Sequence, residues 1–440
     1  MGQISSNISI NLNGASSVAA GSDTYSWSAD RHLLMVDIWV PWGATARTAT
    51  FTLSGSDWGV AVLRAAGNTK AVINDSTSGS GRHIEHISLS SAGDNTVKLN
   101  NTIVDVITGG NGNDKITVGS THVGAMLLGG GNDSVTTGNG FVETINVGHG
   151  NNSVTVGKGG SGVVFAGKGR DTITVAGDVD SILAGHGNDT VKTGKGWVGT
   201  IDADRGNDTV TLGSGGAGYV SLGRDADTIR LSRLDDPTMT VVIDGGSRVS
   251  SSAFKDSDTI DFSALSAKLS VSLSGPHTVT SSQGNFLIRN FENAVGGRGN
   301  DTLAGDSGNN ILKGGAGNDR IEGGLGADKL YGGSGADTFF FRSVKDSTVA
   351  AFGRDTIHDF SKSQKDKIDI SAIDANTKAS GNQAFDFIGT KTFTKTAGEL
   401  RNKKKNGDIY VYGDVNGDGK ADFSIVLDLS LTMSKSDFIL

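Results

Sequence analysis

An acidic or amide residue closes a Gly-rich turn at nearly constant intervals through the first half of the chain. Successive markers stand 19 residues apart, with one interval of 18, at Asn95, Asp114, Asp133, Asn152, Asp171, Asp189, Asp208 and Asp227. A fixed period is the signature of repeat architectures, in which each unit packs only on its neighbours. We therefore expect a stack of similar units rather than a conventional globular core.

Each repeat contains two short segments in which apolar and polar residues alternate. Val154 and Val156 follow the marker Asn152, and Ile145 and Val147 precede it. Alternation with period two predicts strands that bury one face. Two strands joined by Gly turns form one coil of a parallel β-solenoid, so the fold class is predicted to be all-β. Helical periodicity is confined to 342–350 and 394–403.

A second array follows with a strict period of nine, marked by Asp301, Asn310, Asp319, Asp328 and Asp337. Its units, such as Gly-Gly-Ala-Gly-Asn-Asp-Arg-Ile-Glu at 314–322, match the nonapeptide pattern of calcium-binding parallel β-helices. Calcium prefers several oxygen ligands from carboxylates and backbone carbonyls, and Gly turns allow carbonyls to converge. We expect several calcium ions between coils, held by Asp114, Asp133, Asp171, Asp189, Asp208, Asp227, Asp301, Asp319, Asp328 and Asp337.

A further candidate calcium loop contains Asp414, Asn416, Asp418 and Asp422. These residues stand at the ligand positions of an EF-hand-type loop. The bidentate Glu that closes such a loop is absent, because Ile425 occupies its place. The alternative is an Asp- and Asn-rich hairpin turn that binds no metal.

The nonapeptides make the chain resemble the RTX, or hemolysin-type, calcium-binding family. From about residue 256 the sequence also resembles the C-terminal domain of serralysin-type secreted metalloproteases, in Asp-Thr-Ile-Asp-Phe-Ser-Ala-Leu (258–265), Asp-Thr-Ile-His-Asp-Phe (355–360) and Asp-Lys-Ile-Asp-Ile-Ser-Ala (366–372). The resemblance implies a calcium-stacked β-roll. The protease itself is not expected, because no His-Glu-x-x-His motif occurs, and His83-Ile-Glu-His86 has the wrong spacing.

Three domains are predicted: a β-rich N-terminal cap at 1–80, the 19-residue solenoid at 81–232, and a serralysin-like β-roll at 233–440. The last contains the nonapeptides (296–341) and a C-terminal secretion region. The first holds Trp27, Trp39, Trp42 and Trp58, with strands expected within 32–42, 48–53 and 60–64. Its alternative role is an aromatic platform on which sugars stack.

Composition and resemblance predict an extracellular destination. The chain has no Cys, and residues 1–30 lack the basic start and apolar stretch of a Sec signal peptide. The ending Asp437-Phe438-Ile439-Leu440 resembles that of type I secretion substrates of Gram-negative bacteria. No apolar run is long enough for a transmembrane helix, and the net charge of −8 argues against nucleic acid as a partner. The type I secretion machinery is therefore an expected partner.

One column of the 19-residue array carries cations, at the position three residues before the marker: His149, Lys168, His186, Arg205 and Arg224. With coils about 4.8 Å apart, these residues would form a cationic ridge that suits a linear polyanion. The alternative is solvated charge without a ligand. The expected function is a calcium-folded binding, adhesion or matrix module for extracellular polysaccharide or cell envelope.

A polysaccharide-modifying enzyme, either a lyase or an epimerase, is the alternative function. Its support is an outward column of Thr117, Thr136, Thr155, Thr174 and Thr211, which could line a groove. No Gly-x-Ser-x-Gly elbow and no phosphate-binding loop occur, so no catalytic residue is expected.

Overall fold

The computed structural model describes residues 8–11, 34–40, 47–53, 59–67, 69–75, 83–89, 93–246 and 256–440 of the chain. The chain forms two compact units, Met1–Arg224 (unit 1) and Asp225–Leu440 (unit 2). The regular structure of the described residues is strand, apart from two single-turn 3-10 helices, η1 (Ala351–Gly353) and η2 (Lys435–Asp437). This confirms the all-β class. The predicted boundary between 232 and 233 stays a prediction.

The two segments with helical periodicity are not helices. Residues 342–350 are irregular, and 394–403 runs into the strand β36 (Glu399–Lys405). This strand pairs with β37 (Asp408–Asp414) along its whole length. Cross-strand pairing and burial of Leu400 override the local periodicity.

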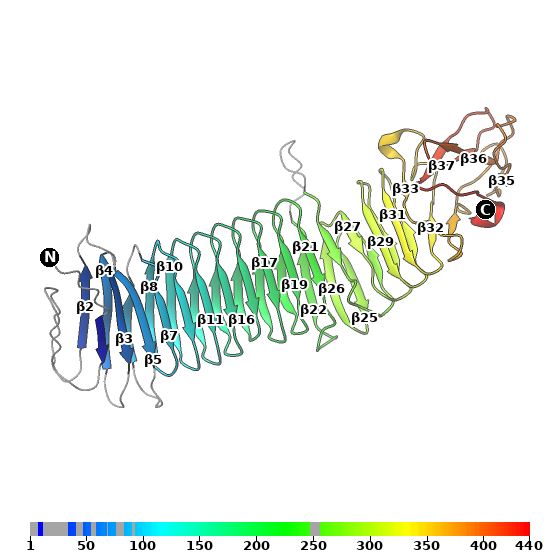
Figure 1. Ribbon diagram of the computed structural model, residues 1–440. Coiled ribbons are helices and arrows are strands. Elements are labelled where there is room, and N and C mark those ends of the chain that lie inside the picture. The colour runs from blue at the N-terminus through cyan, green and yellow to red at the C-terminus, as the bar shows by residue number, and fades with distance from the viewer. Residues whose placement is uncertain are drawn as a thin grey trace. The chain divides into compact units, whose positions relative to one another are not determined.

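Unit 1 is a stack of coils, each of which contributes one strand to each of two parallel sheets (Figure 1). The first sheet contains β1 (Ile8–Asn11), β3 (Arg47–Leu53), β5 (Thr69–Asp75), β7 (Thr96–Leu99), β9 (Lys115–Val118), β11 (Ser134–Thr137), β13 (Ser153–Val156), β15 (Thr172–Val175), β17 (Thr190–Thr193) and β19 (Thr209–Leu212). The second contains β2 (Leu34–Val40), β4 (Gly59–Gly67), β6 (His83–Ser88), β8 (Ile103–Gly110), β10 (Val123–Gly129), β12 (Val142–Asn146), β14 (Ser161–Phe165), β16 (Val179–Leu183), β18 (Val198–Asp202) and β20 (Ala217–Ser221).

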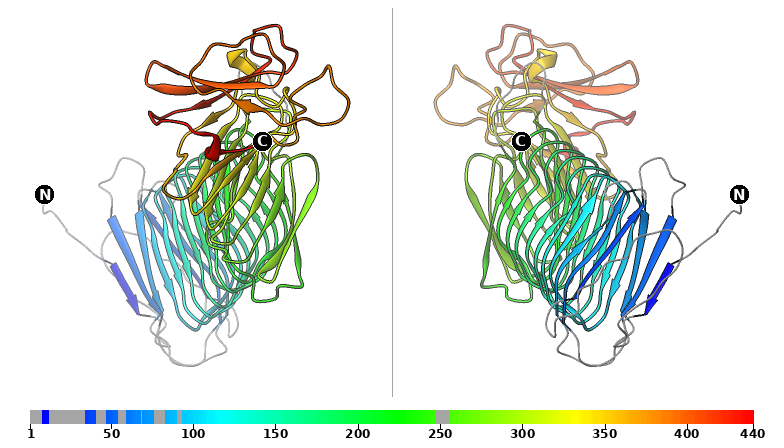
Figure 2. Two further views of the ribbon diagram at one scale, coloured as in Figure 1. Left: turned by 90° about the vertical axis from the view of Figure 1, so that its right-hand side faces the viewer. Right: turned by 90° about the vertical axis from the view of Figure 1, so that its left-hand side faces the viewer.

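The register of these sheets repeats the sequence period. Val135 pairs with Val154 in the next coil, and Val154 pairs with Ile173 in the one after. All three side chains are at most 1% exposed. Because a slip by one residue would turn each apolar column to solvent, burial fixes the register. In Figure 2 the successive coils of unit 1 overlie one another.

The described strands of the first 80 residues extend the same two ladders. Strand β2 pairs with β4 and β4 with β6, while β3 pairs with β5 and β5 with β7, all in parallel. Trp39 lies on β2, and Trp27, Trp42 and Trp58 lie outside the described residues. The capping role of this region stays a prediction.

Unit 2 contains three sheets. The main sheet contains β21 (Thr228–Leu231), β23 (Thr259–Asp261), β27 (Asn293–Val295), β29 (Ile311–Ala316), β31 (Lys329–Ser334), β33 (Thr356–Ile357), β38 (Phe423–Leu427), β37, β36 and β35 (Asp386–Phe387). The small sheet contains β24 (Ser270–Ser272), β28 (Thr302–Ala304), β30 (Arg320–Glu322), β32 (Thr338–Phe340), β34 (Lys367–Asp369) and β39 (Phe438–Ile439). The third contains β22 (Thr240–Asp244), β26 (Gly284–Arg289) and β25 (His277–Ser281).

Two nonapeptides form one coil of unit 2. Leu312 pairs with Leu330 in the main sheet, and Leu303 pairs with Ile321 in the small sheet, each at an interval of 18 residues. Phe262, Phe286 and Phe339 fill the interior. Coils of this kind bring the turn that precedes each strand into a column, and the markers lie in those turns.

Candidate metal centre

The marker residues form a ladder of buried side chains. In each coil the backbone N–H of the marker donates to the side-chain Oδ1 of the marker in the following coil, and the Asp side chains are at most 2% exposed. The ladder pairs are Asp114–Asp133 (2.7 Å), Asp171–Asp189 (2.7 Å), Asp189–Asp208 (2.7 Å), Asp301–Asp319 (2.7 Å) and Asp319–Asp337 (2.9 Å). One carboxylate oxygen of each acceptor Asp therefore accepts the backbone N–H of the marker in the preceding coil.

The second carboxylate oxygen of most ladder residues has no such role. Among the described residues Oδ2 is buried without a hydrogen-bond partner in Asp114, Asp133, Asp171, Asp189, Asp258, Asp319, Asp328, Asp337 and Asp355. A buried ionised oxygen without a partner is strongly unfavourable. The repetition of this arrangement in nine described residues of the two units indicates that a cation belongs beside Oδ2.

Glycines leave space beside these oxygens. A Cβ on Gly109 would lie 2.5 Å from Asp114 Oδ2 and 2.5 Å from the carbonyl oxygen of Leu128. A Cβ on Gly245 would lie 2.8 Å from Asp258 Oδ2. Only a residue without a side chain leaves carboxylate and carbonyl oxygens facing this space.

The pKa values of the ladder carboxyls show how unfavourable the charge is there. Burial raises the pKa of Asp133 to about 7, of Asp319 to about 7 and of Asp258 to about 9. The backbone N–H on Oδ1 lowers each pKa, and neighbouring carboxylates raise it again. Without a cation these groups would take up protons near neutral pH.

The donor set fits calcium. Among the described residues no three His, Asp or Glu side chains converge on one point, so backbone carbonyls must complete each cage. A hard cation that accepts many oxygens in flexible geometry suits one carboxylate oxygen surrounded by turn carbonyls.

The ladder also contains residues that depart from the pattern. Asp301 accepts N–H groups on both oxygens, from Leu269 at 2.8 Å and Gly297 at 2.6 Å. Asn152 fills the usual cation space with its own amide, which donates to the carbonyl oxygens of Gly150 (3.1 Å) and Ala166 (3.3 Å). In both coils the Oδ1 atom of the marker still accepts a backbone N–H, but the second side-chain atom also has a hydrogen-bond partner.

Three ladder residues are absent from the predicted ligand set. Asp258, Asp355 and Asp366 accept the N–H groups of Asp227, Asp328 and Asp337, each at 2.9 Å. Their intervals of 31, 27 and 29 residues break the period that identified the others. The signal that could have found them is an Asp followed by one residue and then Ile, as in Asp171-Thr-Ile.

The predicted EF-hand-type loop has its carboxylate oxygens engaged within the turn. Asp414 accepts the N–H groups of Gly417 (2.6 Å) and Gly419 (2.8 Å). Asp422 accepts the N–H of Val415 and the amide of Asn416, both at 2.8 Å. Asp418 accepts the N–H of Lys420 at 2.8 Å. This pattern is the one that the turn alternative expects, and calcium binding here stays a prediction.

The cationic ridge residues occupy one column of unit 1. Parallel backbone bridges join them in the order His149, Lys168, His186, Arg205 and Arg224. Four of the side chains are exposed, and the half-buried His186 has its Nε2 atom 3.3 Å from Asp204 Oδ2.

The two histidines of the incomplete protease-like motif contact neighbouring coils separately. His83 Nε2 lies 2.7 Å from Asp105 Oδ1, and His86 Nε2 lies 3.0 Å from Thr108 Oγ1. These contacts are those of surface histidines on β6.

Two family models match the chain. The C-terminal domain of serralysin (peptidase M10) matches residues 249–440. The RTX calcium-binding nonapeptide repeat, in four copies, matches 104–121, 156–191 and 200–217. The second match falls on the 19-residue array, so the two arrays share one type of turn.

The chain is also similar to solved structures. One of them, a subunit of a mannuronan C5-epimerase from Azotobacter vinelandii, is 27% identical over 33% of this chain and 76% of that chain, with a TM-score of 0.24. No curated protein matches the chain. No helix among the described residues is long and apolar enough to cross a membrane.

Proposed function

Because the chain carries RTX calcium-binding nonapeptide repeats and a serralysin C-terminal domain, which indicate calcium binding and type I export to the extracellular space, we propose that its solenoid is a binding module. Its ligand is an acidic extracellular polysaccharide or the acidic polymers of a cell envelope. Calcium folds the module, and the cationic ridge contacts the polymer.

The observation that carries this proposal is the register of the ridge. The backbone bridges place one ridge residue in each successive coil, and coils are about 4.8 Å apart. A linear polyanion lying along the stack would therefore meet one ridge residue at each coil from His149 to Arg224, and three of these residues are Lys or Arg. The chain as a whole carries −8, so attraction of a polyanion has to come from a local surface of this kind.

The electrostatic origin of the contact predicts its salt dependence. The Debye length shortens from about 10 Å at 0.1 M salt to about 3 Å at 1 M, so exposed charges attract the polymer less at high salt. Binding of polygalacturonate or alginate to the calcium-loaded protein should weaken steeply over this range.

A triple substitution tests the proposal. Lys168→Ser, Arg205→Ser and Arg224→Ser together should weaken polygalacturonate binding at low salt and leave calcium-dependent melting unchanged, because these side chains point away from the ladder. Equal binding by the triple variant and the parent would refute the ridge. In the same mixtures, new unsaturated ends or altered uronate composition would establish the alternative, a lyase or an epimerase.

A further inference from the structure

The main sheet of unit 2 carries Lys, Arg and Tyr residues at alternating positions of neighbouring strands. Strand pairing places Lys329 beside Thr356, Thr356 beside Val426, Val426 beside Tyr410, and Tyr410 beside Lys403. Alternate positions on the same strands add further residues of this face. We call this surface the basic face; it contains Lys313, Lys329, Tyr331, Arg354, Arg401, Lys403, Lys405, Tyr410 and Tyr412.

Aromatic rings position the cations on this face. Arg354 Cζ lies 5.3 Å and Lys405 Nζ 5.5 Å from the centre of the Tyr410 ring. The Tyr410 and Tyr412 rings stack at 6.0 Å with an angle of 15° between their planes. Because the rings contact the cations from one side, the charged groups stay available to a partner.

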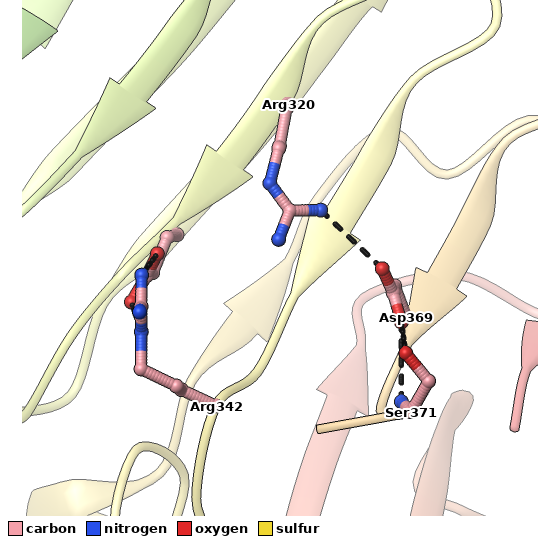
Figure 3. Close-up of polar contacts among 5 residues, drawn as sticks. Arg320, Arg342, Asp369 and Ser371 are labelled. Carbon is pink, nitrogen blue, oxygen red and sulfur yellow. Dashed lines mark hydrogen bonds and ion pairs between the residues drawn. The ribbon is translucent and has the colours of Figure 1, made fainter. Parts of the chain in front are cut away.

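In the described part of unit 2, the cations of the basic face are not paired with its carboxylates, which include Asp408, opposite Lys405, and Asp428, which lies 2.9 Å from His358. Among the described residues none of its six Lys and Arg side chains forms an ion pair. Two arginines at the small sheet are neutralised: Arg320 contacts Asp369 at 3.3 Å, and Arg342 contacts Glu322 at 2.7 Å (Figure 3). These two arginines are therefore structural, whereas among the described residues the cations of the basic face contact no carboxylate.

An exposed phenyl ring lies beside the basic face. Phe352, in η1, is 85% exposed, and the nearby Val349 is 42% exposed. Arg354 Nη1 donates to the Val349 carbonyl oxygen at 2.9 Å, which ties this loop to the arginine that covers Tyr410. The loop thus presents apolar side chains next to a cluster of cations.

We propose that the basic face and Phe352 dock unit 2 on an anionic lipid surface. Lysines and arginines attract anionic headgroups, tyrosines suit the interfacial layer, and an apolar ring enters the acyl boundary. An acidic polysaccharide would use the cations but would leave Phe352 in water. Docking in this way would orient unit 2 with the basic face and Phe352 toward the lipid surface.

Vesicle sedimentation with the calcium-loaded full chain tests the proposal. The chain should bind vesicles of phosphatidylcholine with phosphatidylglycerol and not vesicles of phosphatidylcholine alone. Lys329→Ser, Lys403→Ser and Lys405→Ser together should weaken binding about 100-fold, since each cation near an anionic surface contributes about fivefold. Phe352→Ser should weaken it about tenfold or more.

The ridge triple variant is the charge-matched control, because it also removes three cations from an exposed surface. It should bind vesicles as the parent does, while the basic-face variant should bind polygalacturonate as the parent does. Equal loss of vesicle binding by both triple variants would overturn the proposal in favour of unspecific charge attraction. So would a basic-face variant that loses polygalacturonate but keeps vesicles, or a Phe352→Ser variant that binds vesicles unchanged. Failure of the ridge proposal would leave these outcomes unaffected.

Discussion

The N–H of Asp133 donates to Oδ1 of Asn152 at 2.8 Å, the same contact that an Asp makes at this position in other coils. Asn and Asp are therefore equivalent as acceptors of the backbone N–H. They differ at the second side-chain atom, because the Asn152 amide donates to turn carbonyls and an Asp oxygen cannot. Whether a coil requires calcium is thus decided by the second side-chain atom of its marker, which is a nitrogen in Asn and an oxygen in Asp.

Asn152→Asp should create an additional calcium site. The new Oδ2 would face the carbonyl oxygens of Gly150 and Ala166, which repel it unless a cation lies between them. We expect one more bound ion per chain by native mass spectrometry. The reciprocal variant Asp171→Asn should bind one ion fewer; an unchanged ion count in both would contradict this reasoning.

Removal of calcium should unfold the chain. Without the ion, coils such as those of Asp133 and Asp319 bury a carboxylate oxygen that has no hydrogen-bond partner, and neighbouring carboxylates repel one another. Circular dichroism should show a largely disordered chain in chelator and a strong β signal in millimolar calcium. The same β signal in both solutions would show that the Gly turns and the apolar columns are sufficient for folding without calcium.

Lowering the pH in chelator should partly restore the metal-free fold. Burial raises the pKa of Asp133 and Asp319 to about 7 in the metal-free fold, above the value near 4 of an unfolded Asp. The metal-free fold therefore holds more protons than the unfolded chain between about pH 4 and pH 7, and it loses stability as pH rises through that window. Circular dichroism in chelator should show more β signal at about pH 5 than at about pH 7.5; equal signals at the two values would exclude this linkage.

Gly314→Ala should weaken calcium binding at Asp319. A Cβ there would collide with Asp319 Oδ2 and would lie 2.6 Å from the carbonyl oxygen of Gly332. Overpacking of this kind destabilises by about 1–3 kcal/mol. Gly308→Ala is the control, because the nearest atom to its Cβ, Asp306 Oδ1, is 3.3 Å away. Calcium titration of both variants should separate them, with the control close to the parent.

Removal of residues 391–440 should abolish export through a type I channel, because the serralysin C-terminal match extends to residue 440. Removal of one coil, residues 134–152, is the control, since it joins Asp133 to Ser153 and keeps the ladder in register. Secretion of the first variant at the level of the second would place the signal elsewhere.

Most of the ladder could be predicted from the sequence because its period is local. The spacing of Asp114 and Asp133 is also the length of a coil, so the marker column and the apolar columns follow from counting. Asp258 and Asp355 follow longer intervals, and only the folded chain shows that these return to the same column. The engaged oxygens of Asp301 likewise depend on Leu269 and Gly297, which no spacing rule connects.

The basic face could not be predicted from sequence for a related reason. Lys329, Tyr410 and Lys403 are joined through antiparallel strands that break the repeat. Their proximity depends on the order of strands β33, β38, β37 and β36 in the sheet, and this order differs from their order in the chain.

The ladder contacts all run in one direction, from a backbone N–H to the side chain of the following coil. A stack cut on its C-terminal side therefore ends in a backbone N–H that has lost its acceptor, and a stack cut on its N-terminal side begins with a carboxylate oxygen that has lost its donor. Each coil is completed by its successor, so the solenoid is polar along its axis, with a donor end and an acceptor end.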